Sequence, residues 1–351
     1  MRVMRKDFSW AVSKGVISEG QAEDLWRVLE RRDTDRPRFD LPHVAYYFGA
    51  LVVICAMTWF MTLGWERFGG GGILAISLSY ALGFMVAGGL LWRDKGLKVP
   101  GGLLVTAAVC MTPLAVYGFE RMTGVWLQGA PGEYEDFYDY IKGGWFPMEV
   151  GTVGAGLAAL RFFRFPFLTA PIAFALWFMS MDLTPLIYGR LYYEAQGYQL
   201  VSLVFGLIVL VGAYLVDRRT EEDYAFWGYL FGMFAFWGGL TMFEGGSELD
   251  WCIYGLINAG LIPLSVLLQR RVFVVFGAMG VFGYVGHLAW EIFEDSLLFP
   301  FALSTAGLAI IALGILYAKN RDRIEGTVVR AVPTGTSGAC SRWNARRARG
   351  V

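Results

Sequence analysis

Apolar residues in this chain gather into blocks about as long as one membrane-spanning helix, and short charged segments separate the blocks. The first block carries no charged residue from Val44 to Gly64. At 1.5 Å per residue, a helix of that length crosses the roughly 30 Å hydrocarbon core of a bilayer. A membrane β-barrel would instead show alternating segments of about ten residues. The pattern therefore predicts an all-α, polytopic integral membrane protein.

Ten such blocks follow one another along the chain. The predicted spans are about 44–64, 72–92, 99–118, 147–162, 165–184, 198–216, 224–243, 251–269, 272–292 and 297–318. They divide the chain into a cytosolic helical hairpin (1–38), a ten-span domain (39–319) and a disordered basic cytosolic tail (320–351). In the external loop at about 119–146, the residues Tyr134, Phe137, Tyr138 and Ile141 recur at helical spacing, which predicts an amphipathic helix at the outer interface.

The charges support this topology. With the N-terminus inside, 26 of the 30 Lys and Arg residues fall on inner segments and 4 on outer segments, whereas the 30 Asp and Glu residues divide equally. Basic residues accumulate on the cytosolic side of membrane proteins. We therefore expect both chain ends to be cytosolic.

The composition agrees with a membrane protein, because 56% of the residues are hydrophobic and 17% are charged. The four cysteines, which are Cys55, Cys110, Cys252 and Cys340, lack the spacing of a metal site or a disulfide framework. No phosphate loop, nucleophile elbow or dinucleotide fingerprint occurs. We expect no cofactor, no metal, no catalytic residues and no nucleic-acid partner. Enzymatic activity is the less favoured alternative.

A few polar residues fall within the predicted spans, where each needs a reason because burying polar groups in lipid is costly. Asn258 lies five residues before Pro263, and we expect its amide to support a kink at that proline. A substrate contact is the alternative.

His287 and Glu291 share a helix face near the outer end of the ninth span, which favours an interfacial hydrogen-bonded pair over a metal or proton-relay site. Glu149, Asp182 and Glu244 lie at comparable outer depth on other spans. If these carboxylates converge, they form an acidic mouth facing outward.

Prolines and glycines offer two further expectations. Pro113, Pro171, Pro185 and Pro263 are candidates for the broken helices that transporters use. The glycines at 277, 280, 283 and 286, and the pair Gly228 and Gly232, favour close helix packing.

The N-terminal region carries two motifs. Ser18 precedes Gln21 by three residues, the spacing of a helix capping box, within the pattern Trp10-x4-Gly15-x-Ile17-Ser18-x2-Gln21-Ala22-x2-Leu25. Tyr47-Phe48-Gly49-Ala50-Leu51 then opens a span that ends at Trp65. Over these first 65 residues, the chain resembles the bacterial multi-spanning membrane family catalogued as domain of unknown function 2157. The resemblance implies a bacterial inner-membrane location and a small cytosolic hairpin, with no established activity.

Three hypotheses for the function remain open. The first is a non-enzymatic sensory, structural or accessory protein that sits in the lipid bilayer and engages a cytosolic protein through residues 1–36. The second is a secondary transporter with a polar path near Asn258, Pro263 and the outer carboxylates. The third is a membrane enzyme that acts on a lipid-linked substrate at the outer face through His287 and acidic residues. The sequence does not indicate an oligomeric state.

Overall fold

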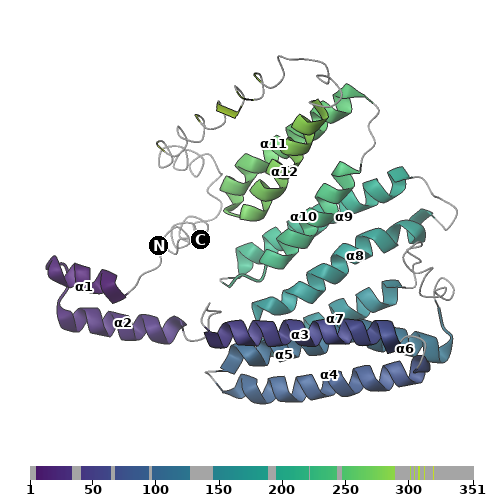
Figure 1. Cartoon of the computed structure of the whole chain (residues 1–351), viewed down its shortest axis with the longest axis horizontal. Helices are drawn as coiled ribbons and strands as arrows, with labels where there is room; N and C mark the ends of the chain where they lie inside the picture. Colours follow the sequence, from purple (N-terminus) through teal and green to yellow (C-terminus); the bar gives the residue numbers. More distant parts are fainter. Residues whose placement is uncertain are drawn as a thin grey trace. The chain divides into compact units, whose positions relative to one another are not determined.

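The computed structural model describes residues 5–33, 41–64, 68–94, 97–126, 145–188, 195–220, 222–242 and 247–288, with six single positions beyond them. Over these ranges the chain is helix and connecting turn with no strand, which confirms the all-α prediction (Figure 1). The chain divides into two compact units, Arg5–Phe243 and Glu244–Val351, the second including Met1–Met4.

The helices of the first unit correspond in order to the predicted N-terminal segment and the first seven predicted spans. They are α1 (Arg5–Ser13), α2 (Glu19–Asp33), α3 (Leu41–Gly64), α4 (Gly69–Arg93), α5 (Lys98–Cys110), α6 (Thr112–Thr123), α7 (Phe146–Phe162), the 3₁₀ turn η4 (Pro166–Leu168), α8 (Thr169–Tyr188), α9 (Ala195–Arg219) and α10 (Phe226–Thr241). The second unit contains α11 (Glu248–Leu268) and α12 (Arg271–His287). Most of the predicted tenth span, residues 127–144 of the external loop, and the tail lie outside the described residues.

Five described helices are long and apolar enough to cross a membrane: Gly69–Arg93, Lys98–Thr123, Pro166–Leu183, Gly197–Arg219 and Glu248–Leu268. The second of these joins α5 and α6. Arg271–His287 is a shorter apolar helix.

The predicted third span corresponds to α5 and α6, with a break at the candidate Pro113, and it ends at Thr123 rather than near residue 118. The helix breaks at Met111, two residues before Pro113, and then continues to Thr123. Proline has no backbone N–H and its ring clashes with the carbonyl four residues back, so Pro113 ends α5 and begins α6. Gly124 then closes α6 in the left-handed conformation at φ 70°.

The other three prolines do not coincide with breaks. Pro171 lies in the first turn of α8, where a proline is tolerated, and the backbone stays helical through Pro185. Pro263 lies inside α11, which is helical from Glu248 to Leu268. Among the predicted broken helices, only the one at Pro113 is found.

The N-terminal helices α1 and α2 pack on each other through one aromatic contact. The rings of Phe8 and Trp26 meet edge to face with their centroids 6.0 Å apart. The capping box at the start of α2 forms as predicted. The Ser18 amide donates to Gln21 Oε1 at 2.9 Å, and the Gln21 amide donates to Ser18 Oγ at 3.2 Å.

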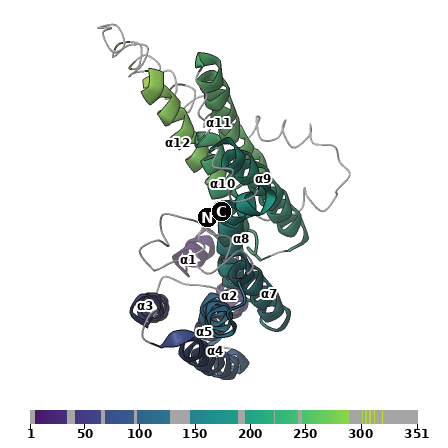
Figure 2. The same ribbon diagram turned by 90° about the vertical axis from the view of Figure 1, so that its right-hand side faces the viewer.

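Glycines let two helix pairs of the first unit approach to backbone contact. A Cβ atom on Gly118 of α6 would lie 2.6 Å from the Leu74 amide nitrogen of α4. A Cβ on Gly239 of α10 would lie 2.7 Å from the Gln199 carbonyl oxygen of α9. One on Gly232 would lie 3.1 Å from a Val209 methyl group, as the packing role predicted for this glycine requires. Helices α9 and α10 accordingly lie side by side in both views (Figures 1 and 2).

In the second unit, α11 and α12 form an antiparallel hairpin that turns at Gln269, a residue with φ 55°. A Cβ on Gly280 would overlap the Asn258 side chain, and one on Gly277 would lie 2.7 Å from the Asn258 carbonyl oxygen. Gly286 has no heavy atom within 4 Å of such a Cβ. The predicted glycine run therefore serves close packing at Gly277 and Gly280 but not at Gly286.

We expect Gly280→Ala to destabilise the protein by about 1–3 kcal/mol, because overpacking forces the Asn258 side chain out of its place. Gly286→Ala is the matched control, and it should be neutral or stabilise by up to about 1 kcal/mol through helix propensity. Thermal unfolding in detergent micelles measures both. Equal melting temperatures for the two variants would contradict the close contact.

Candidate functional site: a buried acidic pair

Two carboxyl groups lie at the same height on the antiparallel helices α7 and α8. Glu149 lies thirteen residues before the end of α7 at Phe162, and Asp182 lies thirteen residues after the start of α8 at Thr169. At 1.5 Å per residue, both are about 20 Å from the turn that joins the two helices. The Asp182 carboxyl lies close enough to act electrostatically on the Glu149 carboxyl. We call these two residues the acidic pair.

Both members of the acidic pair are buried. Glu149 is 5% exposed and Asp182 is 1% exposed. Both carboxyl oxygens of Glu149 and Oδ2 of Asp182 have no hydrogen-bond partner among the described residues. Buried polar atoms in native proteins are almost always hydrogen-bonded, so unpaired carboxyl oxygens at this depth require an explanation.

Local packing fixes the register that brings the pair together. Beside Glu149, Met148 packs in a buried cluster with Leu114 and Tyr117 of α6. Near the middle of the hairpin, a Cβ on Gly156 would overlap the Ile172 side chain, so that side chain packs directly against the backbone of α7. Neither helix can slide along the other without losing these contacts.

Aromatic rings pack along α8 of the same hairpin. Trp145, just before α7, stacks on Phe178 of α8 with an interplanar angle of 6°. Phe174 and Trp177 of α8 in turn contact Phe231 of α10 at centroid distances of 5.5 and 5.9 Å. Large apolar contacts therefore surround α8, and one of them, at Phe178, lies one helical turn before Asp182.

Two further buried oxygens share the end of the helix bundle at which α6 finishes, α7 begins, α8 finishes and α9 begins. Glu120 Oε2 and Gln199 Oε1 are buried and unpaired among the described residues. Among the described residues, these two oxygens and the three of the acidic pair are all of the buried side-chain nitrogens and oxygens without a partner. Each of them is an acceptor oxygen. We call this end of the first unit the α6–α7 side. An interior with surplus acceptors and no surplus donors is suited to receive protons or cations.

Sequence reasoning identified Glu149 and Asp182 but missed Glu120 and Gln199. Glu120 was missed because the predicted third span ended at residue 118, whereas α6 continues to Thr123. Gln199 was overlooked as an ordinary residue near a helix start, although its Nε2 donates to the Met242 carbonyl and its oxygen stays buried. Glu244, the third predicted carboxylate, lies outside the described residues.

Asn258 is fully buried in the α11–α12 interface. Its Nδ2 donates to the Tyr254 carbonyl at 2.8 Å, one turn before itself. The carbonyl that Pro263 leaves without an N–H donor is that of Ala259, so this hydrogen bond serves a different group. Support of the kink by Asn258 stays a prediction.

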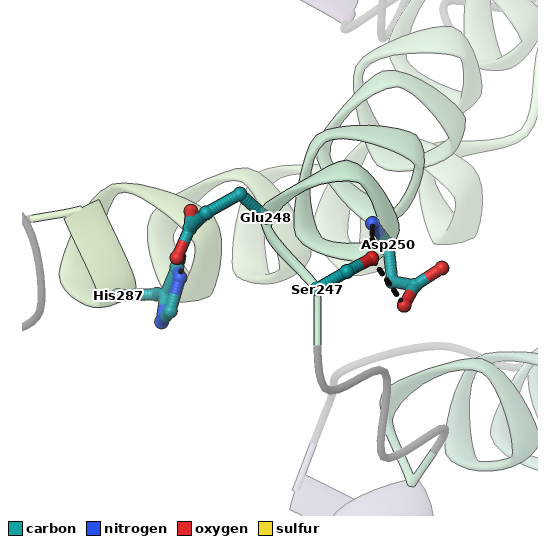
Figure 3. Close-up of polar contacts among 4 residues, drawn as sticks. All are labelled: Ser247, Glu248, Asp250 and His287. Atoms are coloured by element: carbon teal, nitrogen blue, oxygen red, sulfur yellow. Dashed lines mark hydrogen bonds and ion pairs between the residues drawn. The ribbon is translucent and has the colours of Figure 1, made fainter.

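His287 meets residues of α11 that sequence reasoning did not select. Its Nε2 lies 3.4 Å from Oε2 of Glu248 (Figure 3). Its ring stacks on Trp251 with centroids 4.0 Å apart. Glu248 opens α11, which Ser247 caps by accepting from the Asp250 amide (Figure 3). Glu291, the predicted partner of His287, lies outside the described residues.

No group of three or more His, Cys, Asp or Glu side chains suited to a metal ion occurs in the described parts of the chain. His287 in particular has one carboxylate beside it, at Glu248. We call His287, Glu248 and Trp251 the α11–α12 cluster. In this cluster the polar side chains of the two helices have partners, whereas three carboxyl oxygens of the acidic pair have none among the described residues.

Comparison with protein families covers the N-terminal third of the chain. Residues 9–118 match the family described as predicted membrane protein DUF2157. This confirms the resemblance based on Trp10 to Leu25 and Tyr47 to Leu51. No curated protein and no solved structure matches the chain.

The family match ends before the acidic pair. The match contains part of α1, all of α2 to α5 and most of α6, whereas Glu120, Glu149 and Asp182 lie beyond its last residue. The family description therefore supports a membrane protein and assigns no role to these carboxyl groups.

The α11–α12 cluster gives a stability prediction. Because the Glu248 carboxylate is 63% exposed, Glu248→Gln should change the free energy of unfolding by less than about 1 kcal/mol. His287→Ala should cost more, because it removes a ring stack worth about 0.5–1.5 kcal/mol beyond its buried area. Thermal unfolding of the two variants decides between them, and a larger loss in Glu248→Gln would show that the ion pair dominates.

Proposed function

We propose that this protein is an inner-membrane secondary transporter with ten spans and two cytosolic ends, in which the acidic pair binds the coupling cation. The family match and the five long apolar helices support the membrane location. The division of 26 inner against 4 outer basic residues supports the orientation. The α6–α7 side then faces outward.

The observation that carries the proposal is the burial of two neighbouring carboxyl groups without partners. Ionisable residues inside membrane helices are costly and mark ion pathways and proton relays. A structural role would require hydrogen-bonding partners, and apolar residues of similar volume would stabilise the bundle at least as well. Three unpaired oxygens within one helix hairpin fit a site that a cation fills.

This proposal moves the polar path of the transporter hypothesis away from Asn258. The Asn258 side chain abuts Gly280 and donates to its own helix, which supports a packing role. The enzyme hypothesis has less support, since His287 stacks on Trp251 and has one carboxylate beside it among the described residues.

A second candidate is the accessory role through residues 1–36. It is favoured by large apolar side chains that α1 and the turn after it leave uncovered, with Trp10 63% exposed and Val16 72% exposed. Tryptophan is among the residues that contribute most to protein interfaces. Removal of residues 1–36 separates the candidates, because it should leave transport intact and abolish binding of a cytosolic partner.

The orientation predicts which residues an impermeant thiol reagent reaches. In a variant with its four cysteines replaced by serine, Glu135→Cys should react from outside intact cells, and Ser18→Cys should react only after the membrane is opened. Labelling of both from the same side would exclude the ten-span orientation.

The transport proposal predicts uptake that depends on a cation gradient. Proteoliposomes with an imposed pH or sodium gradient are incubated with a bacterial metabolite extract, and the solutes retained inside are identified by mass spectrometry. At least one solute should accumulate severalfold with wild-type protein and not with Glu149→Gln or Asp182→Asn. Glu19→Gln, an exposed carboxylate of α2, is the control that keeps activity. If no solute accumulates under either gradient, the transporter assignment is wrong.

A further inference from the structure

We infer that Glu149 and Asp182 together bind one exchangeable proton, which enters from the α6–α7 side. This inference deepens the proposed function by naming the cation, and it rests on that function only for its role in coupling. Binding itself can be measured without any transported solute.

The number of bound cations follows from charge and burial. Two carboxylates within one apolar hairpin repel each other, and the interior screens this repulsion far less than water does. One proton, held as an O–H on one of the two carboxyls, leaves a single negative charge in the pair and removes the repulsion between them. The remaining negative charge lies beside Glu149 in the first turn of α7, where the positive end of the helix dipole favours it.

The shortage of oxygen ligands favours a proton over a metal ion. Calcium takes six to eight oxygen ligands, and membrane sodium sites use the carbonyls of unwound helices. Helices α7 and α8 are unbroken around the acidic pair, so their carbonyls are engaged in helical bonds, except that of Met181, which Pro185 leaves without an N–H donor. Thr152 is the nearest buried hydroxyl along α7, and it donates to the Met148 carbonyl at 2.6 Å. Four carboxyl oxygens suffice for a proton and are few for a metal ion.

The direction of entry follows from depth. Glu149 lies three residues after the start of α7, whereas the turn at the other end is about 20 Å away. Between the pair and that turn lies a packed apolar cluster that includes Val105 and Leu168, both fully buried. Glu120 and Gln199 place further unpaired acceptor oxygens on the α6–α7 side. Among the described residues, the other buried and unpaired oxygens therefore lie toward the α6–α7 side.

Other titratable groups belong to the helices packed against α7 and α8. On the same half of the bundle they are Cys110 of α5, Tyr117, Glu120 and Arg121 of α6, and Tyr198 of α9. Arg121 donates to the Tyr117 hydroxyl at 3.3 Å. At the opposite end, the Tyr229 hydroxyl donates to Asp217 at 3.4 Å. The carboxyl that acts electrostatically on Glu149 is that of Asp182.

Infrared difference spectroscopy of the full-length protein in lipid tests the inference. The film is perfused alternately with acidic and alkaline buffer, and the carboxylic acid C=O stretch is recorded. Wild-type protein should lose a band equivalent to one proton per chain on the alkaline side. The double variant Glu149→Gln/Asp182→Asn should lack this band, and the exposed-site control Glu19→Gln/Glu23→Gln should keep it.

Each remaining outcome is informative. Absence of a titrating band in wild-type protein, or its persistence in the double variant, overturns the inference. Loss of the band at constant pH when sodium chloride replaces choline chloride would show that the pair takes a metal cation instead. The wild-type measurement stands even if the double variant does not fold.

Sidedness is tested with the same protein in sealed vesicles of known orientation. A rapid external pH jump should displace charge at the pair from the α6–α7 side and not from the other side. A charge displacement confined to the opposite side overturns the entry route. Failure of the metabolite uptake assay together with a titrating band would reject the transporter and retain the proton site.

Discussion

The antiparallel register of α7 and α8 is the constraint on which the candidate site depends. Each helix alone would present one carboxyl group to whatever surrounds it, and each group could turn toward the nearest polar surface. The close approach at Gly156 and the ring stack of Trp145 on Phe178 fix the two helices, so Glu149 and Asp182 stay at one height. A shift of the register by one turn, about 5.4 Å, would separate them. Packing of apolar residues thus determines the electrostatics of the site.

Glycines also permit close contact between other helices. In those pairs the neighbouring side-chain amide groups donate hydrogen bonds. In the α9–α10 pair, Gly239 lies against the backbone carbonyl of Gln199. The side-chain amide of Gln199 donates to the Met242 carbonyl at the end of α10. In the α11–α12 hairpin, Gly280 accommodates the Asn258 side chain, whose amide is satisfied within its own helix. The Asn258 and His287 contacts show that this chain can satisfy buried polar groups when packing is their only task. The unpaired oxygens of Glu149 and Asp182 contrast with them.

The sequence was sufficient to predict the class of fold and the order of the helices, because hydropathy depends on each residue's own solvation. It was insufficient where the outcome depends on a neighbour. The helix containing Glu120 runs past the fall in hydropathy that begins at Glu120 and Arg121, since Tyr117 and Leu114 pack on Met148 and Gly124 provides the stop. The partner of His287 comes from a residue 39 positions earlier, which no local spacing identifies. The proximity of Glu149 and Asp182 likewise depends on the length of the α7–α8 turn. That length follows from where the two helices end, which the hydropathy pattern does not determine.

The unpaired groups are all hydrogen-bond acceptors, and this property connects the geometry to the proposed function. Random imperfections of packing would leave both donors and acceptors without partners, yet the described interior leaves only acceptor oxygens, on four consecutive elements and at one side. In the proposed orientation, protein donors that could satisfy them, such as Arg or Lys side chains, are scarce at that side, because only 4 of 30 basic residues belong to the predicted outer segments. In the proposed orientation, the positive-inside rule therefore also deprives these oxygens of protein cations. The charge they lack is available from the aqueous phase as a mobile cation, and an exchangeable cation is what a gradient-driven membrane protein requires.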